Sequence, residues 1–388
     1  MPELSASFLL TDRLQRLHKS MDPATAVTVC APAGFGKTTL AVSYFNHQAA
    51  EPCRIAWYRL DPEDNNTPVF MAHLTEALFP SEDAGLAESR QILEGQTDMR
   101  LQPHQALVTI CREMWAQHSR GEYTRTYLVL DDFHNVAQNQ DICDITRFML
   151  DNLPPSWSIF VLSRALHEVF TEKQKLEKEI IEINADDLAF SSAEIEDLML
   201  SMGQATANRK LTDTITKTTE GWIAGIIILW QAVKGRNLET AAMESSHLIN
   251  RDALFRYMSL EVLKSVPGDI QDALARLALL QDFSGPEAAE ILNIHDIKSL
   301  MEQCLGFGMF VQRIPGVPVV YRFHSLFREF LLYILHDRYA EELIGELHLQ
   351  AAGYYMQHDT FGRANTWRNA GTLLQRLIWS PRRVLTSL

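Results

Sequence analysis

Basic side chains are under-represented in this chain of 388 residues. Lys and Arg together number 35 against 49 Asp and Glu, so the formal net charge at pH 7 is −14. Binding to nucleic-acid phosphates requires a basic footprint, and anionic membranes attract basic segments. The charge balance therefore argues against general nucleic-acid binding and against adhesion to a membrane surface, although it is compatible with a small basic patch.

Cysteine is also scarce. The five cysteines are scattered and form neither a CxxC pair nor a Cys/His zinc pattern: Cys30, Cys53, Cys111, Cys143 and Cys304. An odd, dispersed set argues against a disulfide framework and against a zinc site, and it is typical of a reducing compartment. We therefore expect a cytoplasmic protein.

Long hydrophobic runs are missing too. The most apolar stretch, Trp222–Val233, is interrupted by Gly225 and Gln231 and is shorter than the roughly 20 residues that a membrane-spanning helix needs. Near the N-terminus the apolar core is only Phe8–Leu10, which is too short for a secretion signal. The composition, 46% hydrophobic and 22% charged, is that of a soluble globular protein, and the length suffices for two or three domains.

Strand-like and helical patterns alternate over the first half of the chain. Most of the strand-like runs are almost continuously apolar, as in parallel strands that helices cover on both faces. The runs are Ala26–Cys30, Arg54–Leu60, Thr126–Asp131, Ser158–Ser163 and Glu179–Ile183, and helical patterns such as Thr38–Ala49 and Pro68–Phe79 lie between them. The alternation predicts a doubly wound α/β domain.

The second half of the chain has different patterns. Beyond about residue 186 the strand signals fade, and Ser191 and Glu194 have the spacing of a capping box that begins a largely helical region extending to about residue 310. Met309–Arg313 and Val319–Phe323 then flank a Pro-rich turn and predict a β-hairpin, and a helical pattern follows at Ser325–Leu335. Helices that end in a hairpin and a further helix predict a winged-helix domain.

The segment Ala31–Thr39 carries the strongest functional motif. It follows a strand-like run and precedes a helical pattern, which is the context that a phosphate-binding P-loop requires. Glycines permit backbone conformations that turn successive N–H groups toward a phosphate, and the next helix adds its positive end. Lys37 can reach the β- and γ-phosphates, and the Thr38 hydroxyl can bind Mg²⁺. The residues expected to cradle ATP or ADP are Ala33, Gly34, Phe35, Gly36, Lys37, Thr38 and Thr39.

The loop departs from the usual pattern at its first position, where Ala31 replaces glycine. A glycine-rich turn with an incidental lysine is the alternative interpretation. The preceding strand, the loop and the following pair of threonines all agree with a P-loop, so we prefer that interpretation.

An apolar run that ends in two acids, Asp131 and Asp132, completes the motifs of a nucleoside triphosphatase. Asp131 would hold the Mg²⁺ shell, and Asp132 could orient or deprotonate the attacking water. The next strand-like run ends in Ser163 and Arg164, where a guanidinium could stabilise the γ-phosphate. A surface arginine in a loop is an equally good interpretation of Arg164.

Five segments resemble the large ATP-dependent LuxR-type transcription activators, which are STAND-class P-loop NTPases. The P-loop segment is shared with many families, whereas the other four in combination are much more specific. The segments are Ala31–Leu40, Trp57–Asn65, Asp131–His134, Thr219–Gly225 and Tyr321–Leu331. The similarity extends over about residues 8–371.

The resemblance implies an α/β P-loop NTPase fold with an ASCE-type parallel sheet, followed by a helical lid and a winged-helix domain. The implied parts are an N-terminal lead (1–20), the NTPase core (21–186), the lid (187–250), the winged helix (251–338), the start of a superhelical repeat region (339–371) and a tail (372–388). In the family an inducer-binding repeat domain and a DNA-binding helix-turn-helix follow. We therefore expect this chain to be C-terminally truncated and not to bind DNA directly.

The resemblance also implies a regulatory switch that binds ATP or ADP with Mg²⁺, hydrolyses ATP slowly and self-associates when ATP is bound. His324 falls where the winged helix of related switches contacts the ADP phosphates, although a buried core histidine fits the sequence equally well. Two other interpretations stay open: an interaction module that nucleotide stabilises without hydrolysis, and a P-loop kinase for a small molecule. The kinase would need clustered arginines after the core, and residues 190–330 lack them.

Overall fold

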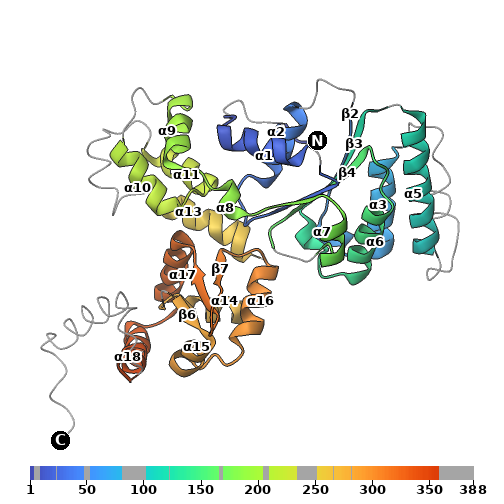
Figure 1. The fold of residues 1–388 in the computed structure, drawn as a ribbon. Helices are drawn as coiled ribbons and strands as arrows, with labels where there is room; N and C mark the ends of the chain where they lie inside the picture. Colours follow the sequence, from blue (N-terminus) through green and yellow to red (C-terminus); the bar gives the residue numbers. More distant parts are fainter. Residues whose placement is uncertain are drawn as a thin grey trace, which may run out of the picture. The chain divides into compact units, whose positions relative to one another are not determined.

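The computed structural model describes residues 1–3, 9–22, 24–47, 53–80, 102–121, 123–165, 169–203, 209–233, 251–264, 266–280 and 282–357 (Figure 1). The chain forms two compact units. The first comprises Met1–Lys217 and Gly221–Ile249, and the second comprises Thr218–Glu220 and Asn250–Leu388. Among the described helices, none combines the length and apolar character that crossing a membrane requires.

The first unit is built on a five-stranded parallel sheet. In spatial order its strands are β2 (Cys53–Arg59), β3 (Arg125–Asp131), β4 (Trp157–Ser163), β1 (Ala26–Cys30) and β5 (Ile180–Ile183). Every neighbouring pair is parallel. The position of β4 between β1 and β3 is the ASCE order, which confirms the predicted fold class. Parallel strands end at one edge of the sheet, so the polar residues after β1, β3 and β4 are brought together there.

Helices cover both faces of this sheet. On one face Phe70 shares a core with Leu128 and Ile159 of the strands, and on the other Tyr44 stacks on Phe160 with ring centroids 5.6 Å apart. The first face carries α3 (Thr67–Leu78), α5 (Gln102–Arg120) and α6 (Gln140–Asp151), and the second carries α2 (Lys37–His47). The remaining short elements are α1 (Asp12–Met21), η1 (Pro62–Asp64), η2 (Phe133–Asn135) and α7 (Glu172–Glu177). The side chains of the strands alternate between two apolar cores, which explains their continuous hydrophobicity.

A small helical lid completes the first unit. It consists of α8 (Ala185–Leu188), α9 (Ser192–Ser201), α10 (Arg209–Thr219), whose last two residues cluster with the second unit, and α11 (Ile223–Val233). The predicted capping box is confirmed, because Ser191 and Glu194 bond reciprocally at the start of α9. The lid has a core of its own, formed by Ile195, Leu198, Met199, Leu211, Ile215, Ile226 and Trp230.

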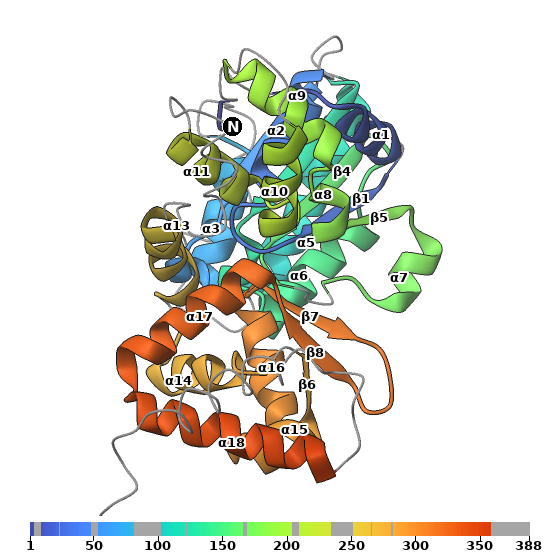
Figure 2. The ribbon, with the colours of Figure 1, turned by 90° about the vertical axis from the view of Figure 1, so that its left-hand side faces the viewer.

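The second unit combines helices with a three-stranded antiparallel sheet of order β6-β8-β7 (Figure 2). Its elements are α13 (Arg251–Met258), the π-helical turn η3 (Ser259–Leu263), α14 (Gly268–Leu277), β6 (Asp282–Ser284), α15 (Gly285–Leu292), α16 (Ile297–Gly306), β7 (Val311–Ile314), β8 (Val320–Phe323), α17 (Ser325–Arg338) and α18 (Glu341–Gln357). Phe283, Phe323 and Phe327 are buried at its centre. The predicted hairpin and the helix after it are confirmed as β7, β8 and α17.

The described part of the region from residue 186 to about 310 is largely helical, as predicted, but it also contains the strand β6 (Asp282–Ser284), which was not predicted. This three-residue strand pairs with β8 and buries Phe283 between two polar residues. A strand this short has no visible period, and its pairing partner lies some forty residues further along the chain. The predicted tail and the last part of the predicted repeat region lie outside the described residues, and the predicted domain boundaries stay predictions.

Candidate nucleotide-binding site

The loop between β1 and α2 has the backbone that its glycines predict. Gly34 has φ 76° and Gly36 has φ 86°, both in the left-handed region that side-chain-bearing residues rarely adopt. Helix α2 begins at Lys37, directly after the loop. Successive turns of this kind and a helix N-terminus form a concave anion-binding surface.

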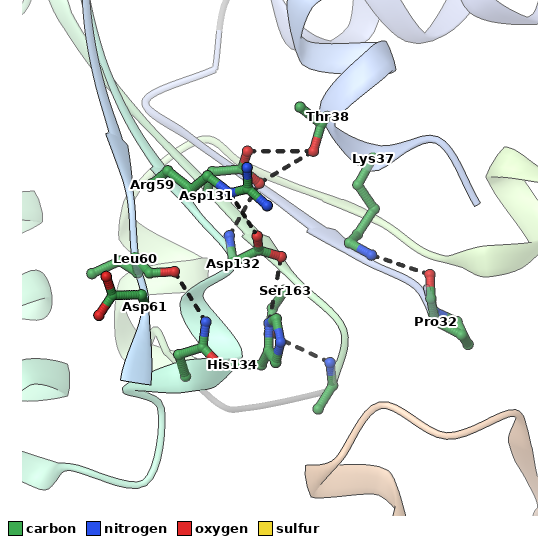
Figure 3. A network of polar contacts seen from close by, with 12 residues as sticks. Pro32, Lys37, Thr38, Arg59, Leu60, Asp61, Asp131, Asp132, His134 and Ser163 are labelled. Carbon is green, nitrogen blue, oxygen red and sulfur yellow. Dashed lines mark hydrogen bonds and ion pairs between the residues drawn. The ribbon is translucent and has the colours of Figure 1, made fainter. Parts of the chain in front are cut away.

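Lys37 lies buried against its own loop. Its ammonium donates to the carbonyl oxygen of Ala31 at 2.7 Å and to that of Pro32 at 3.1 Å, and Figure 3 shows the second of these bonds. Burial, and next the positive charge of Arg164, lower the pKa of Lys37 to about 8, while Asp132 opposes that shift. The lysine is thus a poorly compensated cation, which a bound phosphate would stabilise.

Thr38 and Asp131 meet at the expected place for a metal. The Thr38 hydroxyl lies 3.3 Å from both carboxylate oxygens of Asp131, which is buried at the end of β3 (Figure 3). Burial, reinforced by the charge of Asp132, raises the pKa of the Asp131 carboxyl. No group of three or more His, Cys, Asp and Glu side chains suited to a metal occurs among the described residues. A hydroxyl and one carboxylate still fit Mg²⁺, which keeps several waters and takes substrate phosphates as further ligands.

Asp132 has an unusual backbone and three polar neighbours. Its φ of 57° and ψ of 37° place it in the left-handed region, and its N–H donates to Asp131 at 3.0 Å. Arg59 Nε lies 3.3 Å from one carboxylate oxygen, and His134 Nδ1 lies 3.9 Å from the other. A left-handed non-glycine residue costs about 1–2 kcal/mol, and such strain clusters at functional sites. The positions of Arg59 and His134 beside Asp132 were not predicted; only the order β2-β3 brings Arg59 there.

Arg164 follows β4, the strand between the P-loop strand and the strand of the aspartates. Ser163 pairs in register with Cys30, the last residue of β1. Arg164 is half-buried and close enough to Lys37 for its charge to lower the lysine pKa. The fold therefore brings Arg164, Lys37 and the aspartate pair to one edge of the sheet.

A cavity of about 400 Å³ opens beside the P-loop. Its lining is mostly apolar and comes from three parts of the first unit: the N-terminal segment, the P-loop with α2, and the lid. Representative lining residues are Leu9, Leu14, Phe35, Thr39, Phe190 and Ile223. The sequence alone gave little indication of this cavity, because its walls are far apart along the chain.

Arg13 of α1 ties the N-terminal segment to the lid at this cavity. Its Nε donates to Glu194 at 2.9 Å, its Nη1 donates to the Asp187 carbonyl at 2.8 Å, and its guanidinium lies 4.9 Å from the centroid of Phe190. Sequence reasoning missed this residue, since an arginine in an amphipathic helix carries no signal of its own.

The lid also contacts the P-loop directly. The indole Nε1 of Trp222 donates to the Ala33 carbonyl at 2.9 Å, and the backbone N–H of Ala224 donates to the Gly34 carbonyl at 3.1 Å. Trp222 is fully buried. Trp222 therefore packs in a core and is also hydrogen-bonded to the loop.

His324 belongs to the second unit. Its Nε2 donates to the Thr219 carbonyl at 3.0 Å and lies 3.6 Å from the Glu220 carboxylate. The other oxygen of that carboxylate accepts from the Ser325 N–H at 3.3 Å. Burial lowers the pKa of His324, which favours the neutral ring. A contact of His324 with nucleotide stays a prediction.

The fold and the site define the class: an ASCE-type P-loop NTPase fold with a winged-helix unit after it. Two family models match, the MalT winged helix domain over residues 259–343 and the N-terminal region of nephrocystin 3 over residues 5–164. A solved structure of a Walker-type ATPase from Pyrococcus abyssi has a TM-score of 0.51 at 11% identity and covers 82% of this chain and 94% of that one. This last similarity concerns the fold.

Sequence relatives narrow the class. The chain is 25% identical over 325 residues to the HTH-type transcriptional regulator MalT of Vibrio campbellii, covering 83% of this chain and 34% of MalT. It is 24% identical over 355 residues to the serine/threonine-protein kinase PknK of Mycobacterium tuberculosis, covering 91% of this chain and 31% of PknK. The chain is therefore MalT-like, as its motifs predict, and it spans about a third of the length of these relatives.

Proposed function

We propose that this chain is the nucleotide-operated regulatory module of a LuxR-type transcription regulator of the STAND class. It would bind ATP and ADP with Mg²⁺ and hydrolyse ATP slowly. The observation that carries the proposal is the meeting of Thr38 with Asp131 at the edge of the sheet, beside a glycine loop of the right backbone conformation. A P-loop kept only for structure would not need a hydroxyl and a buried carboxylate at this place.

The phosphates would lie on the backbone N–H groups of the loop. Residues Ala33–Thr39 supply these donors, Lys37 would leave the loop carbonyls to pair with the β- and γ-phosphates, and Thr38 with Asp131 would hold Mg²⁺. When bound, Mg²⁺ would neutralise the charge on the phosphate oxygens. The positive N-terminus of α2 adds to the attraction.

The base and ribose would occupy the cavity beside the loop. Its volume of about 400 Å³ lies within the range typical of small-molecule sites, and its lining is mostly apolar, which suits a flat purine. Arg13 would hold the N-terminal helix and the lid together around the base. Opening of this contact would then be needed for nucleotide exchange.

Hydrolysis would use the residues after β3 and β4. Asp132 would accept a proton from the attacking water. At the same time the water oxygen would bond to the γ-phosphorus, and the bond between the γ-phosphorus and the bridging β-phosphate oxygen would break, so that ADP leaves. Arg164 would stabilise the charge on the γ-phosphate. Arg59 and His134 would hold the carboxylate of Asp132 in place before the water binds.

The regulatory part of the proposal rests on the MalT-like sequence. With ADP bound, His324 would contact the phosphates and favour a closed state; ATP would favour an open state that self-associates. A nucleotide shifts such an equilibrium only by its difference in affinity for the two states. The acidic charge of the chain supports a role without direct DNA binding.

Two variants test the binding and hydrolysis parts separately. Lys37→Ala should weaken ATP and ADP binding roughly 10- to 100-fold, because it removes a charged hydrogen-bond donor to phosphate. Asp132→Ala should leave the ATP Kd within about two-fold and reduce phosphate release by on the order of 100-fold. Unchanged affinity of Lys37→Ala would refute the P-loop assignment, and unchanged turnover of Asp132→Ala would refute the catalytic role.

A module that binds nucleotide without hydrolysis is the second candidate. It is favoured by the ion pair between Arg59 and Asp132, which engages one oxygen of the carboxylate that would otherwise accept the proton. This candidate predicts tight ADP and ATP binding with no phosphate release, either alone or in self-associated form. A single-turnover assay with radiolabelled ATP separates it from the switch.

A further inference from the structure

Two hydrogen bonds from the lid hold consecutive carbonyl groups of the P-loop. Trp222 donates to the Ala33 oxygen at 2.9 Å, and Ala224 donates to the Gly34 oxygen at 3.1 Å. Both donors lie at the start of α11, and both acceptors lie in the turn that is expected to cradle phosphate. A Cβ built on Gly36 would lie 3.7 Å from Ile223, so α11 also packs on the end of the loop.

Peptide geometry gives these bonds a consequence for the phosphate site. A trans peptide is planar, and its C=O and the following N–H point in opposite directions. When Trp222 fixes the Ala33 carbonyl, it fixes the Gly34 N–H on the opposite side; Ala224 does the same for the Phe35 N–H through the Gly34 carbonyl. The lid therefore determines the orientation of two of the donors that are expected to bind phosphate.

Core packing alone does not account for the bond of Trp222. Trp230 lies in α11, the helix that begins directly after Trp222, and is also buried, yet its Nε1 has no hydrogen-bond partner among the described residues. Trp222 instead reaches a carbonyl 189 positions away in the sequence, in the functional loop.

We propose that Trp222 is a positioning residue for phosphate binding. Its indole N–H, together with the Ala224 N–H, orients the P-loop amides before the phosphate binds. The affinity for phosphate therefore depends on the packing of α11 against the loop. This inference rests on the proposed nucleotide site. It implies that any movement that lifts α11 from the loop weakens the hold on the phosphates more than the hold on the base.

The test compares two matched variants, Trp222→Phe and Trp230→Phe, by calorimetric titration of the full chain with ADP and with AMP. Trp222→Phe leaves the Ala33 carbonyl buried without its donor and should weaken ADP roughly ten-fold, with less than a two-fold change for AMP. Trp230→Phe should leave both affinities within two-fold, because the Trp230 N–H makes no comparable bond in the part of the chain that the structure describes.

Other outcomes are equally informative. An equal loss for ADP and AMP in Trp222→Phe would mean that Trp222 only supports the lid, and an unchanged ADP affinity would overturn the proposal outright. If Trp222→Phe does not fold, replacement of Trp222 by benzothienylalanine removes the N–H with almost no change of shape and gives the same readout. Absence of ADP binding in the unmodified chain would instead refute the proposed nucleotide site.

Discussion

At the scale of single residues, burial sets the protonation behaviour of the candidate site. Lys37 is a cation enclosed by its own loop, with its pKa lowered to about 8, whereas burial raises the pKa of the neighbouring Asp131. Both shifts disfavour the charged form of the group. Nucleotide phosphates and Mg²⁺ would favour these charged forms, so ligand binding and ionisation are coupled here.

The first prediction concerns the pH dependence of ADP binding. Above pH 8, Lys37 is increasingly uncharged in the free protein, and a bound phosphate would raise its pKa again. Binding should therefore take up a proton, and ADP affinity should fall as pH rises from about 8 to 9.5. Calorimetry in buffers of different ionisation enthalpy measures both effects. Constant affinity over this range would contradict the placement of Lys37 against the phosphates.

The second prediction concerns acid stability through His18. This side chain is buried between α1 and α2, 2.9 Å from the Ser43 hydroxyl, and burial followed by the charge of His47 lowers its pKa from 6.5 to about 4. The unfolded chain therefore takes up the proton first, and stability should fall as pH decreases from about 6.5 to 4. His18→Gln should make this decline shallower in urea denaturation of the first unit. An unchanged slope would show that His18 does not contribute to it.

At the scale of elements, the turn between α10 and α11 determines how the lid is built. Glu220 and Gly221 both have positive φ, 49° and 81°. The Gly221 carbonyl accepts from the Phe190 N–H at 3.0 Å, and a Cβ at Gly221 would lie 2.7 Å from the backbone N and O of Phe190. The turn thus needs glycine for its conformation and also for close approach to a residue that lines the cavity.

The third prediction follows from that close approach. Gly221→Ala should lower the free energy of unfolding of the first unit by about 3 kcal/mol or more, because it adds a clash with backbone to an unfavourable φ. Gly203→Ala is the matched control, since Gly203 has φ 96° but, among the described residues other than its chain neighbours, no atom lies within 4 Å of the added Cβ, and it should cost about 1 kcal/mol. Equal losses in chemical denaturation would mean that Phe190 simply moves aside.

Elements with strong local patterns were predictable. The apolar strands β1 and β4 agree with the predicted runs to within a residue, and the Ser191 capping box begins α9 as expected. The short strand β6 was missed because its stability comes from pairing with β8 rather than from its own sequence. Motif residues of the site were likewise predictable, whereas Arg59, Arg13 and the bond of Trp222 depend on neighbours distant in sequence.

At the scale of the whole molecule, the relevant feature is the chain segment that joins the two units. Thr218–Glu220 cluster with the second unit, and the chain continues directly into Gly221 and Trp222 of the first. His324 bonds to Thr219 within the second unit, and Trp222 bonds to the P-loop within the first. A short covalent segment therefore connects the winged helix to the candidate phosphate site.

The fourth prediction uses this connection to test the switch. ADP should slow backbone hydrogen exchange in the P-loop and at the start of α17, near His324, while α15 stays unchanged; ATP should protect the P-loop but not α17. His324→Ala should weaken ADP binding several-fold and leave ATP binding unchanged. Protection by ADP that is confined to the first unit would show that the predicted role of His324 is wrong while leaving the P-loop intact.

The sequence by itself determined the class of this protein. The spacing of Gly34, Gly36, Lys37 and Thr38 after an apolar strand, and the acids after another, are local patterns, and local patterns are readable without a fold. Tertiary structure decided which groups surround them: strand order brought Arg59 to Asp132, and lid packing brought Trp222 to the Ala33 carbonyl. Such contacts form between segments up to 189 residues apart in the sequence. Which segments meet is determined by burial of the whole core, and a local sequence pattern carries no information about it.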